Sequence, residues 1–223
     1  MENPWFNFNP PEGGSRFHDL DKAHAIAFNK GMSRQEYKLA EHLEPFPYLG
    51  NPDAKVVVLL ANPFATEEES LPSFRIDSEQ EKQLRRNLVH LDLDSSQSKF
   101  HSPAVSLIES IWHKPRIKEL VSATSLDQVA QGIFFVNYHA YNSKSWQPIP
   151  FTFETQRYSF NLVNKAIERN SLIIMSRNKL GWFTAVPDLF DYNNKVMMKS
   201  SRGVYLSEGN LGKEVFNEIL NRL

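Results

Sequence analysis

The chain has 223 residues, of which 41% are hydrophobic, enough to bury the core of one α/β domain with insertions. Its formal net charge is -1. This lacks the strongly basic balance typical of nucleic-acid-binding domains, although segregated charge can still form a local basic site. The absence of cysteine excludes disulfides, thiolate metal sites and a cysteine nucleophile, and it favours a reducing compartment.

Neither a membrane span nor a signal segment is visible in the sequence. No apolar run approaches the roughly 18 residues that a spanning helix needs. The first residues, MENPWFNFNP, lack the basic-then-apolar pattern of a secretory signal. We therefore expect a cytoplasmic monomer that does not associate with a membrane.

The N-terminal region begins with an irregular leader over residues 1–16, which is rich in proline and glycine and is expected to dock through Trp5, Phe6 and Phe8. Residues 17–43 then show a helical pattern that breaks near Gly31. Ser33 lies just after that break, and Glu36 follows three residues later; this pair predicts a capping box. The next segment, EPFPYLGNPDA, is turn-rich and cannot be regular helix.

Short apolar runs rich in β-branched residues predict strands buried on both faces. Four such runs occur along the rest of the chain, at residues 55–61, 132–136, 171–175 and 195–198.

Helical patterns separate these runs. They cover residues 79–91, 103–122, 154–169 and 210–222, and polar or proline-containing loops cover 64–78, 92–102 and 140–153.

Strands that alternate with helices predict a parallel sheet with helices on both faces. We expect a three-layer α/β/α fold with a short, mainly parallel four-stranded sheet, in a single domain over residues 17–223. Ligands of such folds bind beyond the carboxyl ends of the strands. The residues that directly follow the four strands are therefore the candidate site.

Three of these four strand ends carry an amide and two carry a cation. Asn62 follows the first strand and Asn137 the second, while Arg177 and Lys199 follow the third and fourth. An asparagine offers a donor and an acceptor to a planar heterocycle, and it can also orient a water molecule. Arginine or lysine can stabilise a phosphate or a leaving group that carries negative charge. Phe64 and Tyr138 stand close by in sequence and could stack on a flat ligand.

Three segments resemble motifs of the uracil-DNA glycosylase superfamily, closest to its single-strand-selective and mismatch-specific branches. GNPDAKVVVLLANPFA (50–65) resembles the first motif, in which a buried strand runs into an Asn-Pro loop. FFVNYHAYNS (134–143) resembles a second-strand element in which an asparagine reads the base edge. MMKSSRGVYLSEGNLGKEVFNEIL (197–220) resembles the last motif, and the resemblance spans roughly residues 45–223.

The resemblance implies a role for each matching residue. Asn62 falls on the position that orients the attacking water, and Phe64 lies near the residue that stacks on the base. Asn137 falls on the position that hydrogen-bonds the edge of an extruded base, with Tyr138 and His139 beside it. The substrate implied is DNA, single-stranded or carrying a modified base. No metal and no organic cofactor are implied, because water is the nucleophile.

The last motif departs from the family pattern. Lys199 stands where the family has a histidine that stabilises the departing base. Ser200, Ser201 and Arg202 follow, and together with Arg177 they are the expected contacts to phosphate. Phe64 also replaces a glycine of related branches, which changes the shape expected for the pocket.

Simpler interpretations exist for each of these residues. An Asn-Pro pair after a buried strand also makes an ordinary turn, and Asn137 could satisfy nearby backbone groups. His139 fits a structural role, and Arg177 fits a surface one. Residues 199–202 also fit a surface loop.

The remaining polar residues that could be considered as metal ligands fit simpler roles. His18 and His24 lack the spacing of metal ligands on a helix. His90, Asp92 and Asp94 fit a solvated loop better than a metal site.

The leading hypothesis is a DNA glycosylase-like hydrolase that cleaves the bond between an ordinary or modified base and its sugar. The alternative is a catalytically degenerate module of the same fold that binds nucleic acid or a nucleotide. A nucleotide-using protein of another type is disfavoured, because the sequence contains no Gly-x-x-x-x-Gly-Lys or Gly-x-Gly-x-x-Gly loop.

Overall fold

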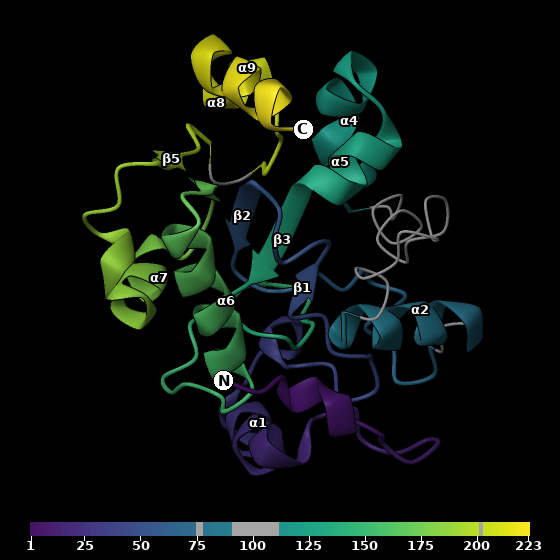
Figure 1. Cartoon of the computed structure of the whole chain (residues 1–223). Helices are drawn as coiled ribbons and strands as arrows, with labels where there is room; N and C mark the ends of the chain where they lie inside the picture. Colours follow the sequence, from purple (N-terminus) through teal and green to yellow (C-terminus); the bar gives the residue numbers. More distant parts are fainter. Residues whose placement is uncertain (75–77, 91–111, 201–202) are drawn as a thin grey trace.

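The computed structural model describes residues 1–74, 78–90, 112–200 and 203–223. Within this part of the chain one five-stranded sheet forms, with strand order β1-β3-β2-β4-β5 (Figure 1). Its strands are β1 (Tyr48–Leu49), β2 (Val56–Leu60), β3 (Ile133–Asn137), β4 (Leu172–Met175) and β5 (Lys195–Met197).

The sheet is mainly parallel, as predicted. β2 pairs in parallel with both β3 and β4, and β5 extends the sheet in parallel beside β4. The predicted count of four strands is wrong, since β1 adds a fifth strand that runs antiparallel to β3. β1 has only two residues, inside the turn-rich segment 44–54, which is too short to show a strand periodicity in the sequence.

Helices connect the strands and flank them. They are η1 (Pro4–Asn7), α1 (Asp19–Gly31), η2 (Gln35–Tyr37), α2 (Ser78–Leu88), α4 (Lys114–Ala123), α5 (Leu126–Gly132), α6 (Gln156–Glu168), α7 (Lys179–Ala185), η3 (Pro187–Leu189), α8 (Glu208–Leu211) and α9 (Lys213–Arg222).

Both faces of the sheet are covered, and alternate residues of each strand serve opposite faces. Val56 and Val58 of β2 pack with α4, α5, α8 and α9 on one face. Val57 and Leu59 pack with α6 and α7 on the other face. A third cluster joins α1 to the long loop over residues 140–153. Figure 1 shows this division, with α4, α5, α8 and α9 at the top and α6 and α7 to the left.

The break predicted near Gly31 is confirmed, since α1 ends at that residue. The helical pattern and the capping box predicted after the break are wrong, because this region holds only the short helix η2, with no side-chain cap. The helix expected over residues 210–222 is divided at Gly212, whose φ of 92° lies in the region that favours glycine. At Gly212 a backbone break interrupts the apolar pattern, because that pattern carries no information on backbone angles.

Other predicted segments fall partly outside the described residues. The helix expected over 79–91 is α2, which ends at Leu88. Of the segment 103–122, the described part contains α4. The loop over 92–102, with Asp92 and Asp94, lies outside the described residues.

Among the three aromatic residues of the leader, Trp5 is the main anchor to the sheet. Trp5 is buried with the α6 face of the sheet, and Asn3 donates to the carbonyl oxygen of Leu88 at 2.8 Å. Phe8 is partly buried against the same cluster. Phe6 is 65% exposed and does not anchor the leader.

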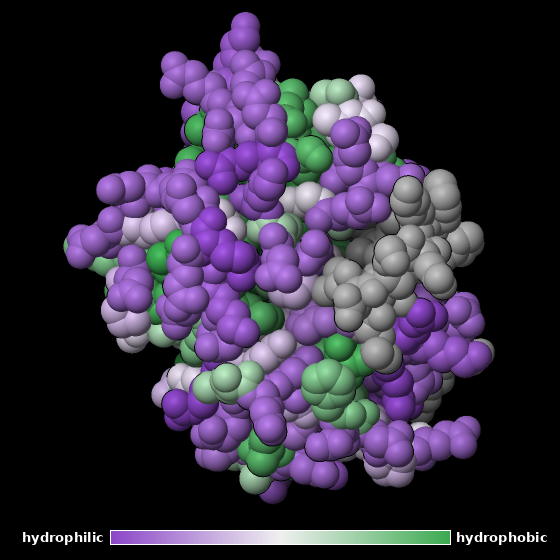
Figure 2. Space-filling view, in the orientation of Figure 1, coloured by the Kyte–Doolittle hydropathy of each residue, from purple (hydrophilic) through white to green (hydrophobic). Residues whose placement is uncertain are grey.

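The outer surface is largely polar. Figure 2 shows hydrophilic side chains over most of the visible face, with separate small apolar areas between them. Among the described helices, none combines the length and the apolar character that crossing a bilayer requires.

The turn between β1 and β2 makes a testable demand on one glycine. Gly50 has a φ of 102°, and a Cβ added to it would overlap the carbonyl oxygen of Ile133 in β3. We expect Gly50→Ala to lower the free energy of unfolding by about 2–3 kcal/mol, measured by urea denaturation. Gly31→Ala is the matched control, because an added Cβ there meets no atom within 4 Å at the end of α1. Equal stability of the two variants would contradict this account of the turn.

Candidate functional site

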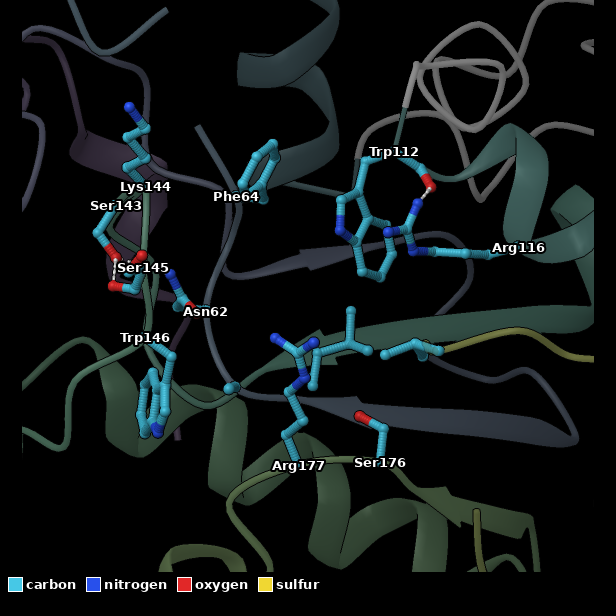
Figure 3. Close-up of a pocket in the computed structure, with 13 residues that line it drawn as sticks. Asn62, Phe64, Trp112, Arg116, Ser143, Lys144, Ser145, Trp146, Ser176 and Arg177 are labelled. Carbon is cyan, nitrogen blue, oxygen red and sulfur yellow. Dashed lines mark hydrogen bonds between the residues drawn. The ribbon is translucent and has the colours of Figure 1, made fainter. Parts of the chain in front are cut away.

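A pocket of about 270 Å³ opens beyond the carboxyl ends of β2 and β4 (Figure 3). Leu60, Ala61 and Asn62 line it from the end of β2, and Ser176 and Arg177 line it from the end of β4. The long loop after β3 and the start of α4 supply the other walls. Its position agrees with the rule that parallel sheets bind ligands beyond the carboxyl ends of their strands.

Asn62 is held in place by the loop that follows β3. Its Nδ2 donates to Ser143 Oγ at 2.8 Å and to the carbonyl oxygen of Pro63 at 3.0 Å. The Ser143 hydroxyl in turn donates to the carbonyl oxygen of Ser145 at 2.9 Å. These bonds commit the amide nitrogen, and no hydrogen bond within the described residues uses Asn62 Oδ1. The asparagine therefore presents a fixed acceptor at the pocket.

The backbone of the two loops is also joined. Phe64 and Ser143 form a parallel bridge, and the Ala65 N–H donates to the Ser143 carbonyl oxygen at 3.2 Å. β2 ends at Leu60, and Pro63, which has no N–H, cannot donate to a further β ladder. The loop after β3 thus acts as a support for the loop that carries Asn62.

Three aromatic rings stand around the pocket. Phe64, Trp112 and Trp146 line it from three separate segments (Figure 3). Phe64 is 48% exposed, which leaves its ring accessible. Flat aromatic surfaces of this kind can stack on a planar ring.

Positive charge gathers at the same pocket. Arg116, Arg177 and Lys144 line it, and no acidic side chain is among the described lining residues. Lys144 pairs at 3.0 Å with Glu67, whose side chain is 86% exposed. Three cationic side chains thus line the pocket of a chain that is nearly neutral as a whole.

Arg116 is held by stacking. Its guanidinium lies 4.2 Å from the centroid of the Trp112 ring and 5.8 Å from that of Tyr205. Its Nη1 also donates to the Trp112 carbonyl oxygen. Burial lowers the pKa of Arg116 from its usual value; Tyr205 acts to raise this pKa and the positive charge of Arg177 acts to lower it.

Asn137 lies behind the pocket wall and does not line the pocket. Its partner in the β2 register is Leu60, which does line it. Asn137 Nδ2 donates to the Phe46 carbonyl oxygen at 2.8 Å. The Oδ1 of the same amide is buried and has no hydrogen-bond partner. An unpaired buried acceptor costs roughly 1–3 kcal/mol.

Tyr138 and His139 also lie behind the wall. Tyr138 packs edge-on against Trp146 and Trp182, with ring centroids 6.4 and 5.2 Å away. His139 is buried and stacks on Trp146 at 5.4 Å, and its Nδ1 accepts from the Tyr141 N–H. Both residues support the Trp146 ring, whereas direct contact with a base was predicted for them.

The last motif does not bring its cation to the pocket. The Lys199 Nζ lies 3.5 Å from the Gly209 carbonyl oxygen at α8, and the Ser200 N–H donates to Asn210 Oδ1 at 2.8 Å. Neither residue lines the pocket. Ser201 and Arg202 lie outside the described residues.

Several pocket residues were not predicted from the sequence as site residues, among them Trp112, Arg116, Ser143 and Trp146. Ser143 and Trp146 belong to the long loop after β3, so its length was the one signal available. Trp112 and Arg116 precede or begin α4 and reach the site only through the packing of that helix. Within the described residues, no group of three His, Asp or Glu side chains could hold a metal ion.

Comparison of the chain with protein-family models, with curated proteins and with solved structures gives no match. A functional assignment must therefore come from the chemistry of the pocket.

The histidine that supports Trp146 predicts a pH dependence of stability. Burial lowers the pKa of His139 to about 3, against the opposing influence of its hydrogen bond with the Tyr141 backbone. An unfolded histidine titrates near 6.5. As the pH falls from about 6.5 towards 3, the unfolded chain therefore gains a proton that the folded protein excludes, and stability is lost.

We expect His139→Asn to make this loss shallower by about 1.4 kcal/mol per pH unit near pH 5. The measurement is urea denaturation of both proteins at several pH values between 7 and 4. Parallel stability curves for the variant and the unaltered protein would contradict a neutral, buried His139.

Proposed function

We propose that this chain binds a nucleotide unit of DNA in the pocket and hydrolyses the bond between its base and its sugar, as a glycosylase of the uracil-DNA glycosylase type. The observation that carries the proposal is the fixed Asn62 amide in a pocket with aromatic walls and positive charge. The resemblance of residues 50–65 and 134–143 to that superfamily points the same way.

Asn62 is the residue proposed to position the nucleophile. Its Oδ1 accepts a hydrogen bond from a water molecule, which places the water oxygen for attack on the anomeric carbon of the sugar. The C–N bond breaks with its electron pair going to the base, and the water oxygen forms the new bond to carbon. One proton of the water ends on the released base.

The aromatic walls suit a base that has left the helical stack. An enzyme that acts on the base–sugar bond extrudes the nucleotide into a pocket. Stacking on an aromatic ring contributes roughly 1–3 kcal/mol per base. Phe64, Trp112 and Trp146 offer such surfaces, and the exposed ring of Phe64 is accessible to an entering base.

The departing base carries negative charge that needs a cation or a hydrogen-bond donor. Lys199 was the predicted source, but its Nζ lies at α8. Arg177 rises from the end of β4 into the space between Asn62 and Trp112, as Figure 3 shows. We assign the electrostatic role to Arg177.

A second candidate is a module of the same fold that binds nucleic acid or a nucleotide without cleaving it. One specific observation favours it: neither Asn137 nor Lys199, which carry base reading and leaving-group stabilisation in the family pattern, lines the pocket. The binding residues would then be the same aromatic and basic side chains.

Asn62 separates the two candidates. We expect the purified protein to generate alkali-labile abasic sites in single-stranded or mismatched oligonucleotides that carry uracil, hypoxanthine or an alkylated or hydroxymethylated base. Asn62→Ala should reduce the rate at least 100-fold, while oligonucleotide affinity falls less than threefold, because Oδ1 acts on water rather than on DNA. Asn217→Ala, an exposed change on α9, is the matched control and should leave the rate unaltered.

Each alternative outcome has a definite meaning. Binding without abasic sites on any of these substrates would support the second candidate. An Asn62→Ala variant that cleaves at the unaltered rate would remove Asn62 from the mechanism. Absence of both binding and cleavage would reject both candidates.

A further inference from the structure

A buried carboxylate on α1 joins the two ends of the loop that follows β3. Asp21 is fully buried in the first turn of α1, where the helix dipole favours a negative charge. The Tyr141 hydroxyl donates to its Oδ2 at 2.6 Å, and the Thr155 hydroxyl donates to the same oxygen. The Thr155 N–H donates to the other oxygen, Oδ1, at 3.2 Å. Tyr141 stands at the start of the loop over residues 140–153 and Thr155 follows its end, so one side chain of a distant helix fixes both ends.

The returning half of this loop depends on side-chain contacts. The outgoing half is paired through its backbone at Asn142 and Ser145, which bond to the segment between α1 and β1. Within the described part of the chain, no backbone hydrogen bond joins residues 146–152 to another segment. The bonds from α1 to Thr155 are therefore an anchor for this half of the loop, which begins with the pocket residue Trp146.

A continuous series of packed rings leads from the carboxylate to the pocket wall. The Tyr141 ring packs edge-on against Phe153, with the two centroids 5.0 Å apart. Phe153 packs against His139 at 6.3 Å, and His139 stacks on Trp146 at 5.4 Å. The first three rings are each at most 2% exposed, so a displacement of one is transmitted to the next in the close-packed interior. The orientation of the Trp146 wall therefore depends on the Tyr141 ring that Asp21 holds.

We infer that Asp21 is a positioning residue of the pocket, which orients the Trp146 wall from α1 through Tyr141 and Thr155. None of these three supporting residues lines the pocket. The inference extends the site to α1, which lies outside the residues 45–223 that resemble the glycosylase superfamily. The consequence for catalysis rests on the proposed function, whereas the orientation of Trp146 can be measured without it.

Fluorine NMR of the full chain labelled with fluorinated tryptophan measures this orientation directly. A Trp146→Phe variant identifies the Trp146 resonance, and Trp112 on another wall of the pocket is the internal reference (Figure 3). We expect Tyr141→Phe and Thr155→Val, each of which removes one hydroxyl donor to Asp21, to shift or broaden the Trp146 resonance and to leave that of Trp112 in place. Thr155→Ser keeps the hydroxyl and should leave the Trp146 resonance at its original position.

Ser171→Ala is the matched control for a general loss of stability. It also removes a buried hydroxyl, whose hydrogen bond to the Ala54 carbonyl oxygen at 3.2 Å lies at the amino end of β4, and it should leave the Trp146 resonance unmoved. Thermal unfolding identifies any variant that fails to fold, and Tyr141→Phe and Thr155→Val provide independent readings. A Trp146 resonance that stays in place in the folded hydroxyl variants, that moves equally in Ser171→Ala, or that moves equally in Thr155→Ser overturns the inference.

The abasic-site assay separates failure of this inference from failure of the proposed function. We expect Thr155→Val to lower the cleavage rate about tenfold, because a small displacement of a pocket wall misaligns the bound nucleotide, and Thr155→Ser to cleave at the original rate. If the unaltered protein forms no abasic sites, the hydrolase is rejected, while a shifted Trp146 resonance still sustains the positioning role. If Thr155→Val shifts Trp146 but cleaves at the unaltered rate, the inference is overturned and the proposed function stands.

Discussion

The complete burial of β2 is the constraint on which the rest of the structure depends. Each of its residues, Val56–Leu60, is at most 4% exposed, and both of its neighbours are parallel strands. Such a strand carries no polar side chain along its length, because an unpaired polar group would be costly in the interior. Polar function is therefore displaced to the end of the strand. Asn62 stands at that end, where the chain leaves the core.

The second requirement is that the asparagine be oriented. The side-chain amide of an asparagine in a turn can form its hydrogen bonds with nearby backbone groups, and it would then not be available to a ligand. Here the hydroxyl of Ser143, 81 residues away in sequence, takes up the amide nitrogen and leaves the oxygen uncommitted. The loop after β3 thus determines what the loop after β2 offers chemically. It also places Trp146, whose ring is supported from behind by His139.

Charge is distributed unevenly over a nearly neutral chain. The formal net charge of -1 indicates no affinity for phosphate. The pocket, however, collects Arg116 and Arg177 without an acidic lining residue among those described. The electrostatic field at the pocket depends on this local arrangement. Exposed charges more than about 10 Å away are largely screened at moderate salt.

The sequence by itself determined the mainly parallel α/β architecture, because buried strands and amphipathic helices leave composition and periodicity signals within a few residues. It also determined that Asn62, Phe64 and Arg177 stand near the ends of strands, since that placement follows from where each predicted strand ends along the chain. Tertiary structure decided which of these residues share a pocket. Asn137 points at Phe46 and Lys199 at α8, whereas Arg116 and Trp146 enter the site from elements with no recognisable motif. The physical reason is that side-chain direction depends on hydrogen bonds and packing between segments far apart in the chain, which local patterns do not encode.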